Sequence, residues 1–218
     1  MFSRLPPATA ALLAANIIIY LLQQLTGVGM ILHFALWPLG PDHVLGVTAQ
    51  GSAVSAGFRI WQVVTYGFLH GGLQHIFFNM LALYMFGGPI ELTFGRRAYV
   101  LYYFVCLIVA AGAQLGVVHF MTGGFYPTLG ASGAIFGLLL AYGMLYPHQR
   151  IMLLIPPIPM PAWLFVGGYV VLELVLGVTG TQAGVAHFAH LGGALAGFVM
   201  ITYWRGKLPI KPRRRLLR

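Results

Sequence analysis

The sequence predicts an all-α membrane protein in which six helices form a single membrane domain over residues 1–218. Hydrophobic residues make up 59% of the 218 residues and charged residues only 7%, against roughly 25% charged in a soluble domain. The mean hydropathy is +0.86, and several uncharged runs approach the length of about 20 residues that a helix needs to cross the hydrocarbon core. These observations exclude an ordinary soluble protein.

Apolar runs between breaks rich in glycine, proline or charge predict the six helices. The breaks include Gly87-Gly88-Pro89 and the proline-rich stretch 156–161. The predicted helices lie at about 8–25, 73–90, 98–121, 130–146, 162–179 and 185–204.

The basic residues orient these helices. Seven of the twelve Lys and Arg residues fall in 205–218, and a basic tail after an apolar helix is typical of a cytoplasmic anchor rather than a nucleic-acid-binding segment. With both termini cytoplasmic, eleven of the twelve lie inside and only Arg59 lies outside. The second, fourth and sixth helices then run from outside to inside. We expect a prokaryotic plasma membrane, no nucleic-acid partner and no disulfide, since Cys106 is the single cysteine.

The segment 26–72 lies outside in this topology and is too long for a simple connector. It carries aromatic residues such as Phe34, Trp37 and Trp61. Two interpretations stay open: an interfacial amphipathic segment without chemistry, and a segment that handles a substrate.

Polar residues within the predicted helices gather at one depth. His75 and Asn79 are four residues apart and share a helix face. Ser132 lies in the first turn of the fourth helix and His190 near the start of the sixth. A rise of 1.5 Å per residue places His75, Ser132 and His190 within roughly 10 Å of the outer edge of the hydrocarbon. Such residues are costly in a membrane and mark function.

A serine beside a histidine is the nucleophile and general-base pair of acyl transfer, and helix-start amides with His75 and Asn79 are candidate oxyanion donors. The patterns Gly133-x-x-x-Gly137 and Gly193-x-x-x-Gly197 allow the fourth and sixth helices to approach closely. Such an approach would bring Ser132 and His190 within hydrogen-bonding reach.

Three acidic residues, Asp42, Glu91 and Glu173, are available as a third member of the site. Asp42 lies in the outer loop and stays possible, Glu91 lies on the inner side, and Glu173 counts to mid-bilayer or deeper. A Ser-His dyad is therefore expected. Three interpretations of Glu173 stay open: it faces a polar cavity, bonds Asn16 or Gln114, or is protonated.

These motifs resemble the rhomboid intramembrane serine proteases over about residues 57–204. The matching patterns are His70-x4-His75-x3-Asn79, Gly130-Ala131-Ser132-Gly133, and Ala189-His190-Leu191-Gly192-Gly193-x3-Gly197, and Gly87-Gly88-Pro89-Ile90-Glu91 is also similar. His190 rather than His187 fits the family spacing His-x-x-Gly-x-x-x-Gly.

The resemblance implies a six-helix rhomboid-like bundle that cleaves a peptide bond of a single-pass transmembrane substrate near the outer membrane face. It implies Ser132 as nucleophile, His190 as general base, and an oxyanion site of His75, Asn79 and the Ser132 N–H. The supporting residues would be His70, Gly130, Gly133 and Phe136. No cofactor or metal is implied; the partners would be transmembrane substrates and the lipid bilayer.

Two positions depart from the family pattern. The family often has Trp-Arg in the first loop where this chain has Trp61-Gln62, and Phe136 is an aromatic without a hydroxyl one turn after the serine. In the resemblance, 26–72 is the membrane-embedded first loop, and the fifth helix with the loop after it is a lateral gate for substrate.

Three other functions compete with this one. An inactive relative would lack the serine or the histidine, and both are present. A proton-relay transporter needs a polar path across the bilayer, whereas these residues lie near one face. A metal enzyme could use His187-x-x-His190 and the pair His70 and His75 as zinc ligands, but the sequence lacks an HExxH pattern and no carboxylate is expected near these histidines.

Overall fold

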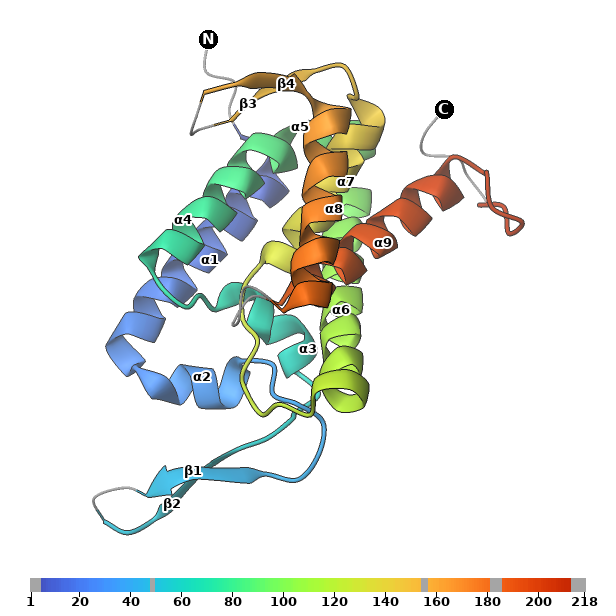
Figure 1. Cartoon of the computed structure of the whole chain (residues 1–218). Helices are drawn as coiled ribbons and strands as arrows, with labels where there is room; N and C mark the ends of the chain where they lie inside the picture. The colour runs from blue at the N-terminus through green and yellow to red at the C-terminus, as the bar shows by residue number, and fades with distance from the viewer. Residues whose placement is uncertain (1–4, 48–49, 154–156, 181–185, 213–218) are drawn as a thin grey trace.

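The computed structural model describes residues 5–47, 50–153, 157–180 and 186–212. The protein is mostly helical (Figure 1). The longer helices are α1 (Pro7–Thr26), α4 (Leu73–Ala82), α6 (Arg96–Val117), α7 (Ser132–Leu145), α8 (Ala162–Thr179) and α9 (His187–Trp204). Shorter helical elements are α2 (Val28–Phe34), α3 (Gln62–Thr65), η1 (Tyr66–Phe68), η2 (Leu83–Gly87), α5 (Gly88–Phe94) and η3 (Val118–Thr122). Two hairpins are formed by β1 (His43–Val47) with β2 (Ala53–Ala56) and by β3 (Arg150–Met152) with β4 (Pro159–Pro161).

Four helices of the described residues are long and apolar enough to cross a membrane: Pro7–Thr26, Leu73–Phe94, Arg96–Thr122 and Ala162–Thr179. The predicted all-α membrane class is thus confirmed, and each predicted run coincides with a helix to within four residues at either end. The apolar helix Ser132–Leu145 is shorter, with 14 residues. Six spans remain a prediction, as does the single domain over 1–218.

The core lies where α6, α7 and α9 pack together. The two predicted small-residue faces meet: a Cβ added to Gly193 would lie 2.7 Å from the carbonyl carbon of Gly133, and one added to Gly197 would lie 3.2 Å from the Cα of Gly137. Around this contact the buried Tyr102 donates a hydrogen bond to the Gly137 carbonyl at 2.7 Å. Backbone contact between α7 and α9 fixes the relative positions of Ser132 and His190, which these two helices carry.

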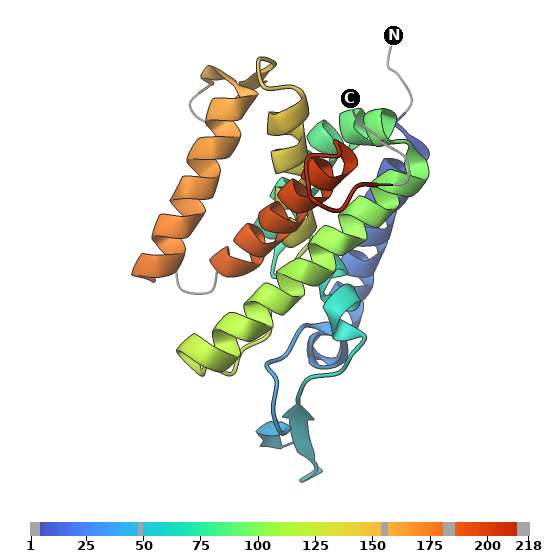
Figure 2. The ribbon, with the colours of Figure 1, turned by 90° about the vertical axis from the view of Figure 1, so that its right-hand side faces the viewer.

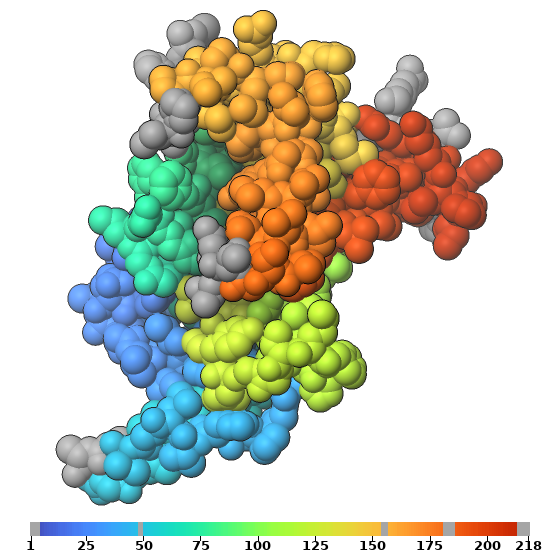
Figure 3. Space-filling model, in the orientation of Figure 1, coloured from blue at the N-terminus to red at the C-terminus, as the bar shows by residue number. Residues whose placement is uncertain are grey.

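In contrast, α8 lies at an edge of the bundle (Figure 2), and its outer side faces the surroundings along its length (Figure 3). Its most apolar stretch is 17% buried, against 28–44% for the other three candidate spans. Its buried residues are Ala162, Val166 and Glu173, which form one stripe at helical spacing. A carboxylate therefore lies on the narrow side by which α8 contacts the bundle.

Glu91 ties the start of α1 to α5. Its carboxylate is buried and accepts hydrogen bonds from the Ala8 N–H at 2.9 Å, the Thr9 N–H at 2.7 Å and the Thr9 hydroxyl at 2.8 Å. A negative charge at a helix N-terminus satisfies amides that lack intrahelical partners and complements the helix dipole. Glu91 thus has a structural role at the end of the bundle opposite the β1–β2 hairpin (Figure 1).

The segment 26–72 has structure of its own, comprising α2, the β1–β2 hairpin, α3 and η1. Gln62, which stands where the resemblance has arginine, is fully buried. Its amide accepts bonds from the Arg59 N–H at 3.1 Å and the Trp37 N–H at 3.3 Å, and donates to the Gly57 carbonyl at 3.2 Å. A neutral amide both donates and accepts hydrogen bonds, so Gln62 can link these loop segments without a charge.

Candidate active site

The site begins at the junction of α7 and α9. His190 Nε2 lies 2.7 Å from Ser132 Oγ, within hydrogen-bonding distance. His190 is 9% exposed, and Ser132 is half-buried. Ser132 begins α7, where the first backbone N–H groups lack intrahelical partners. The structure therefore brings together the serine and the histidine selected from the sequence, beside free-amide positions of a helix start.

A third residue, which the sequence reasoning set aside, completes this arrangement. Glu173 Oε2 lies 3.0 Å from His190 Nδ1 and 2.6 Å from His187 Nδ1. Glu173, which was expected at mid-bilayer or deeper, lies six residues before the end of α8 at Thr179, about 9 Å along the axis, and contacts His190. None of the three interpretations left open for it names these histidines as its partners. Asn16 instead donates to the Leu12 carbonyl.

These contacts determine the hydrogen positions on His190. An ionised carboxylate only accepts hydrogen bonds, so the proton of a neutral His190 is assigned to Nδ1, facing Glu173. The lone pair of Nε2 then faces the Ser132 hydroxyl. A histidine in this tautomer is ready to take a proton from the serine.

The imidazole plane of His190 is held by aromatic stacking. The Phe136 ring lies parallel to it, with a centroid separation of 4.4 Å and an interplanar angle of 6°. Phe136 also contacts Tyr169 of α8, with a ring-centroid separation of 4.9 Å. Phe136 therefore packs against the histidine as the sequence suggested, and α8 touches the site through both Tyr169 and Glu173.

His75 and Gly130 also lie near the serine. His75 Nδ1 accepts a hydrogen bond from the Gly71 N–H at 3.3 Å, so a neutral His75 carries its proton on Nε2. A Cβ added to Gly130, which has φ of +124°, would lie 2.8 Å from His75 Nε2 and 3.6 Å from Ser132 Oγ. The absent side chain of Gly130 thus leaves an N–H donor of His75 close to the serine.

Asn79 is one turn below His75 and 6% exposed. Its Nδ2 has no hydrogen-bond partner among the described residues. A buried amide N–H without a partner is costly in a protein interior, so the Asn79 side chain retains a free capacity to donate a hydrogen bond.

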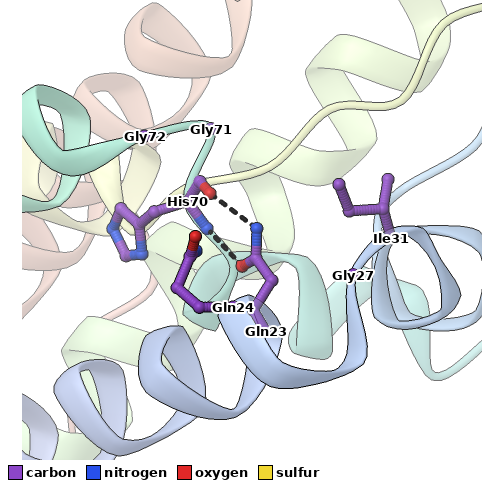
Figure 4. Close-up of a pocket in the computed structure, with 7 residues that line it drawn as sticks. All are labelled: Gln23, Gln24, Gly27, Ile31, His70, Gly71 and Gly72. Carbon is purple, nitrogen blue, oxygen red and sulfur yellow. Dashed lines mark hydrogen bonds between the residues drawn. The ribbon is translucent and has the colours of Figure 1, made fainter.

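His70 packs against His75. Its ring lies edge-on to His75 at a centroid separation of 5.0 Å, and burial lowers its pKa to about 4. Its backbone is held by Gln23 of α1, whose amide donates to the His70 carbonyl at 2.7 Å and accepts from the His70 N–H at 3.1 Å (Figure 4). A cavity of about 230 Å³ opens beside this contact, between α1 and the glycines that follow His70.

The residues Glu173, His187 and His190 also offer metal-ligand atoms within 4.8 Å of one another. The expectation that no carboxylate lies near these histidines was therefore wrong. The hydrogen bonds between Glu173 and the two rings already account for these short distances. The residue at the site that the sequence did not lead us to select is Glu173, and its signal was the presence of an acidic residue in an otherwise apolar helix.

Comparison of the sequence with known proteins shows the family of this chain. The model of the Rhomboid domain matches residues 57–207. The mitochondrial Rhomboid protein 1 of Saccharomyces cerevisiae is 30% identical over 170 residues, 71% of this chain and 44% of the relative. Rhomboid protease GlpG of Serratia proteamaculans is 28% identical over 206 residues, 93% of this chain and 64% of the relative.

Rhomboid protease GluP of Bacillus subtilis is 26% identical over 193 residues, 88% of this chain and 34% of the relative. The chain thus spans less than two thirds of the length of each of these relatives. The family match includes every residue of the site, from His70 to His190. This chain belongs to the rhomboid family.

Proposed function

We propose that this protein is an intramembrane serine endopeptidase that cleaves single-pass transmembrane substrates near the outer membrane face. The observation that carries the proposal is the 2.7 Å contact between His190 Nε2 and Ser132 Oγ. It lies at the start of two apolar helices, so the nucleophile is close to one membrane surface. The names of two relatives as rhomboid proteases add support.

Ser132 is the nucleophile and His190 the general base. As Ser132 Oγ attacks the substrate carbonyl carbon, its proton passes to His190 Nε2 and the carbonyl oxygen gains negative charge. The imidazolium then protonates the leaving amine, and the acyl group remains on Oγ. Water next attacks the acyl carbon and passes a proton to Nε2. The imidazolium then returns this proton to Oγ as the bond between the acyl carbon and Oγ breaks, which releases the acid and restores the serine hydroxyl.

The negative oxygen of the tetrahedral intermediate is stabilised by donors from α4 and from the start of α7. These are the Nε2–H of His75, the Nδ2–H of Asn79 and the Ser132 N–H. His75 and Asn79 come from one face of α4, and the Asn79 Nδ2 has no other hydrogen-bond partner among the described residues. Donors positioned before reaction lower the barrier because they need no reorganisation.

The proposal includes the membrane topology. Six helices cross the membrane, both termini are cytoplasmic, and the site faces the outside of a prokaryotic plasma membrane. The clustering of basic residues at 205–218 supports this orientation. Substrate enters beside α8, the least buried of the four candidate spans.

A fluorophosphonate probe tests the activated serine directly. Wild-type protein, Ser132→Ala and His190→Ala are purified in detergent, and covalent addition is measured by intact mass. We expect one adduct on wild type and none on either variant, with cooperative thermal unfolding retained in all three. If wild-type protein fails to react, or His190→Ala reacts at the wild-type rate, the proposal is wrong.

A further inference from the structure

Glu173 is the one acidic residue of the apolar helix α8, and it contacts the base of the proposed reaction. Its carboxylate is 4% exposed and accepts bonds from both His190 and His187 on α9. We propose that Glu173 is a positioning residue for His190, so that the site works as Ser132–His190–Glu173 rather than as a dyad. This inference rests on the proposed function.

The geometry supports positioning in two ways. The bond at 3.0 Å holds the proton of His190 on Nδ1 and leaves Nε2 free to accept from Ser132. When His190 takes the serine proton, the carboxylate 3.0 Å away stabilises the resulting imidazolium. Phe136 restrains the ring plane, but a stacked phenyl ring cannot select between the two tautomers.

The second donor, His187, orients the carboxylate itself. Both histidines bond the same oxygen, Oε2, and His187 is closer, at 2.6 Å. Side-chain bonds from two positions on α9 thus restrain a glutamate that extends from α8. A restrained carboxylate loses less freedom when it aligns His190 than a mobile one would.

The position of Glu173 on α8 links the base to the helix beside which substrate is proposed to enter. The remaining buried residues of α8, Ala162 and Val166, lie toward its other end. Near the site α8 is held by Glu173, by the contact of Tyr169 with Phe136 and by the packing of Gly177 against His187 of α9. Displacement of α8 would withdraw the carboxylate from His190, so the base is aligned only while α8 is docked.

The comparison of Glu173→Gln with Glu173→Asp tests the role of the charge. Glutamine keeps the size and an acceptor oxygen of glutamate, whereas aspartate keeps the charge on a shorter side chain. If the carboxylate positions and stabilises His190, we expect fluorophosphonate labelling and kcat to fall at least tenfold in Glu173→Gln, with KM within twofold of wild type. Glu173→Asp should retain more activity than Glu173→Gln.

The opposite order would overturn the inference. A merely structural tie between α8 and α9 predicts that Glu173→Gln is at least as active as Glu173→Asp, with losses in thermal stability or KM rather than kcat. Labelling of Glu173→Gln at the wild-type rate has the same meaning. If Glu173→Gln does not fold, Glu173→Asp decides: a lower kcat with KM and thermal stability close to wild type supports the inference, whereas lower thermal stability or a higher KM with kcat unchanged contradicts it.

A neighbouring position supplies the control. Leu174 is 49% exposed on α8, and Leu174→Ala should leave labelling unchanged. The failures of the two proposals are distinguishable. Absence of labelling in wild type contradicts the proposed function, whereas equal labelling of wild type and Glu173→Gln, with Ser132→Ala unlabelled, contradicts only the role of Glu173.

Discussion

Gly193 allows α7 and α9 to pack with their backbones in contact, and Gly193→Ala perturbs the site without touching a reacting group. An added Cβ would overlap the carbonyl oxygen of Gly133 and lie 2.7 Å from the carbonyl carbon. Ordinary contacts between carbon atoms are about 3.5–4.0 Å. The two helices must therefore separate locally by about 1 Å, since the neighbouring atoms belong to backbone rather than to a flexible side chain.

The separation has consequences for both rate and stability. His190 is three residues before Gly193 and Ser132 directly precedes Gly133, so the 2.7 Å contact between Nε2 and Oγ lengthens with the helices. A misplacement of about 1 Å at a reacting centre costs about 100-fold in rate. Overpacking of a core costs about 1–3 kcal/mol. We expect losses of these sizes in fluorophosphonate labelling and in the free energy of unfolding.

Gly112→Ala is the matched control. A Cβ added to Gly112 on α6 meets nothing within 4 Å, and alanine is favoured over glycine within helices by about 0.5–1 kcal/mol. Labelling rate and thermal unfolding in detergent are measured for both variants. Wild-type labelling by Gly193→Ala, with an unchanged unfolding temperature, would refute the argument that close approach of α7 and α9 aligns the site.

Three further predictions concern other parts of the molecule. His75→Ala or Asn79→Ala should each lower kcat by about 10²–10³, as loss of one oxyanion donor does; full activity in both would remove them from the site. Glu91→Ala leaves three donors of α1 unpaired and should lower the free energy of unfolding by about 2–5 kcal/mol, measured by denaturation in detergent; unchanged stability would contradict its capping role. Arg59, through its hydrogen bond and charge, holds the pKa of Asp42 below its ordinary value, so the pair supports the β1–β2 hairpin at neutral pH and this support is lost as the pH falls through the lowered pKa. Amide protection of the hairpin in wild type should exceed that in Asp42→Asn at pH 7 and converge with it in acid; equal protection at pH 7 would argue against the pair.

Much of the fold follows from local sequence patterns. The helix predicted at 162–179 has those bounds in the structure, because a proline-rich stretch and Gly180 delimit a long apolar run. The spacing of glycines predicted the contact between α7 and α9, and that contact accounts for the proximity of Ser132 and His190. These features depend on periodicity and residue size, which one sequence displays.

Other features depend on how helices turn and tilt relative to one another. A count of residues along α8 gives the distance of Glu173 from the outer membrane face only when the count starts at the outer end of the helix. The count does not show in which direction around the helix axis the side chain points. The shared helix face of Ala162, Val166 and Glu173 shows on which side of α8 the glutamate lies. It does not show which helix packs against that side, because tertiary packing decides this. The hydrogen bonds of Gln62 could not be predicted from the sequence either, because its partners are backbone groups of a loop without periodicity.

Cleavage of a membrane substrate is the most direct test of whether this protein is an intramembrane serine endopeptidase. Wild-type protein and Ser132→Ala are reconstituted in liposomes with a panel of single-pass transmembrane proteins, and products are located by mass spectrometry. We expect cleavage by wild type at a bond near the outer membrane face, and no product with Ser132→Ala. Equal product formation by both proteins, or cleavage by wild type confined to the cytoplasmic side, would contradict it.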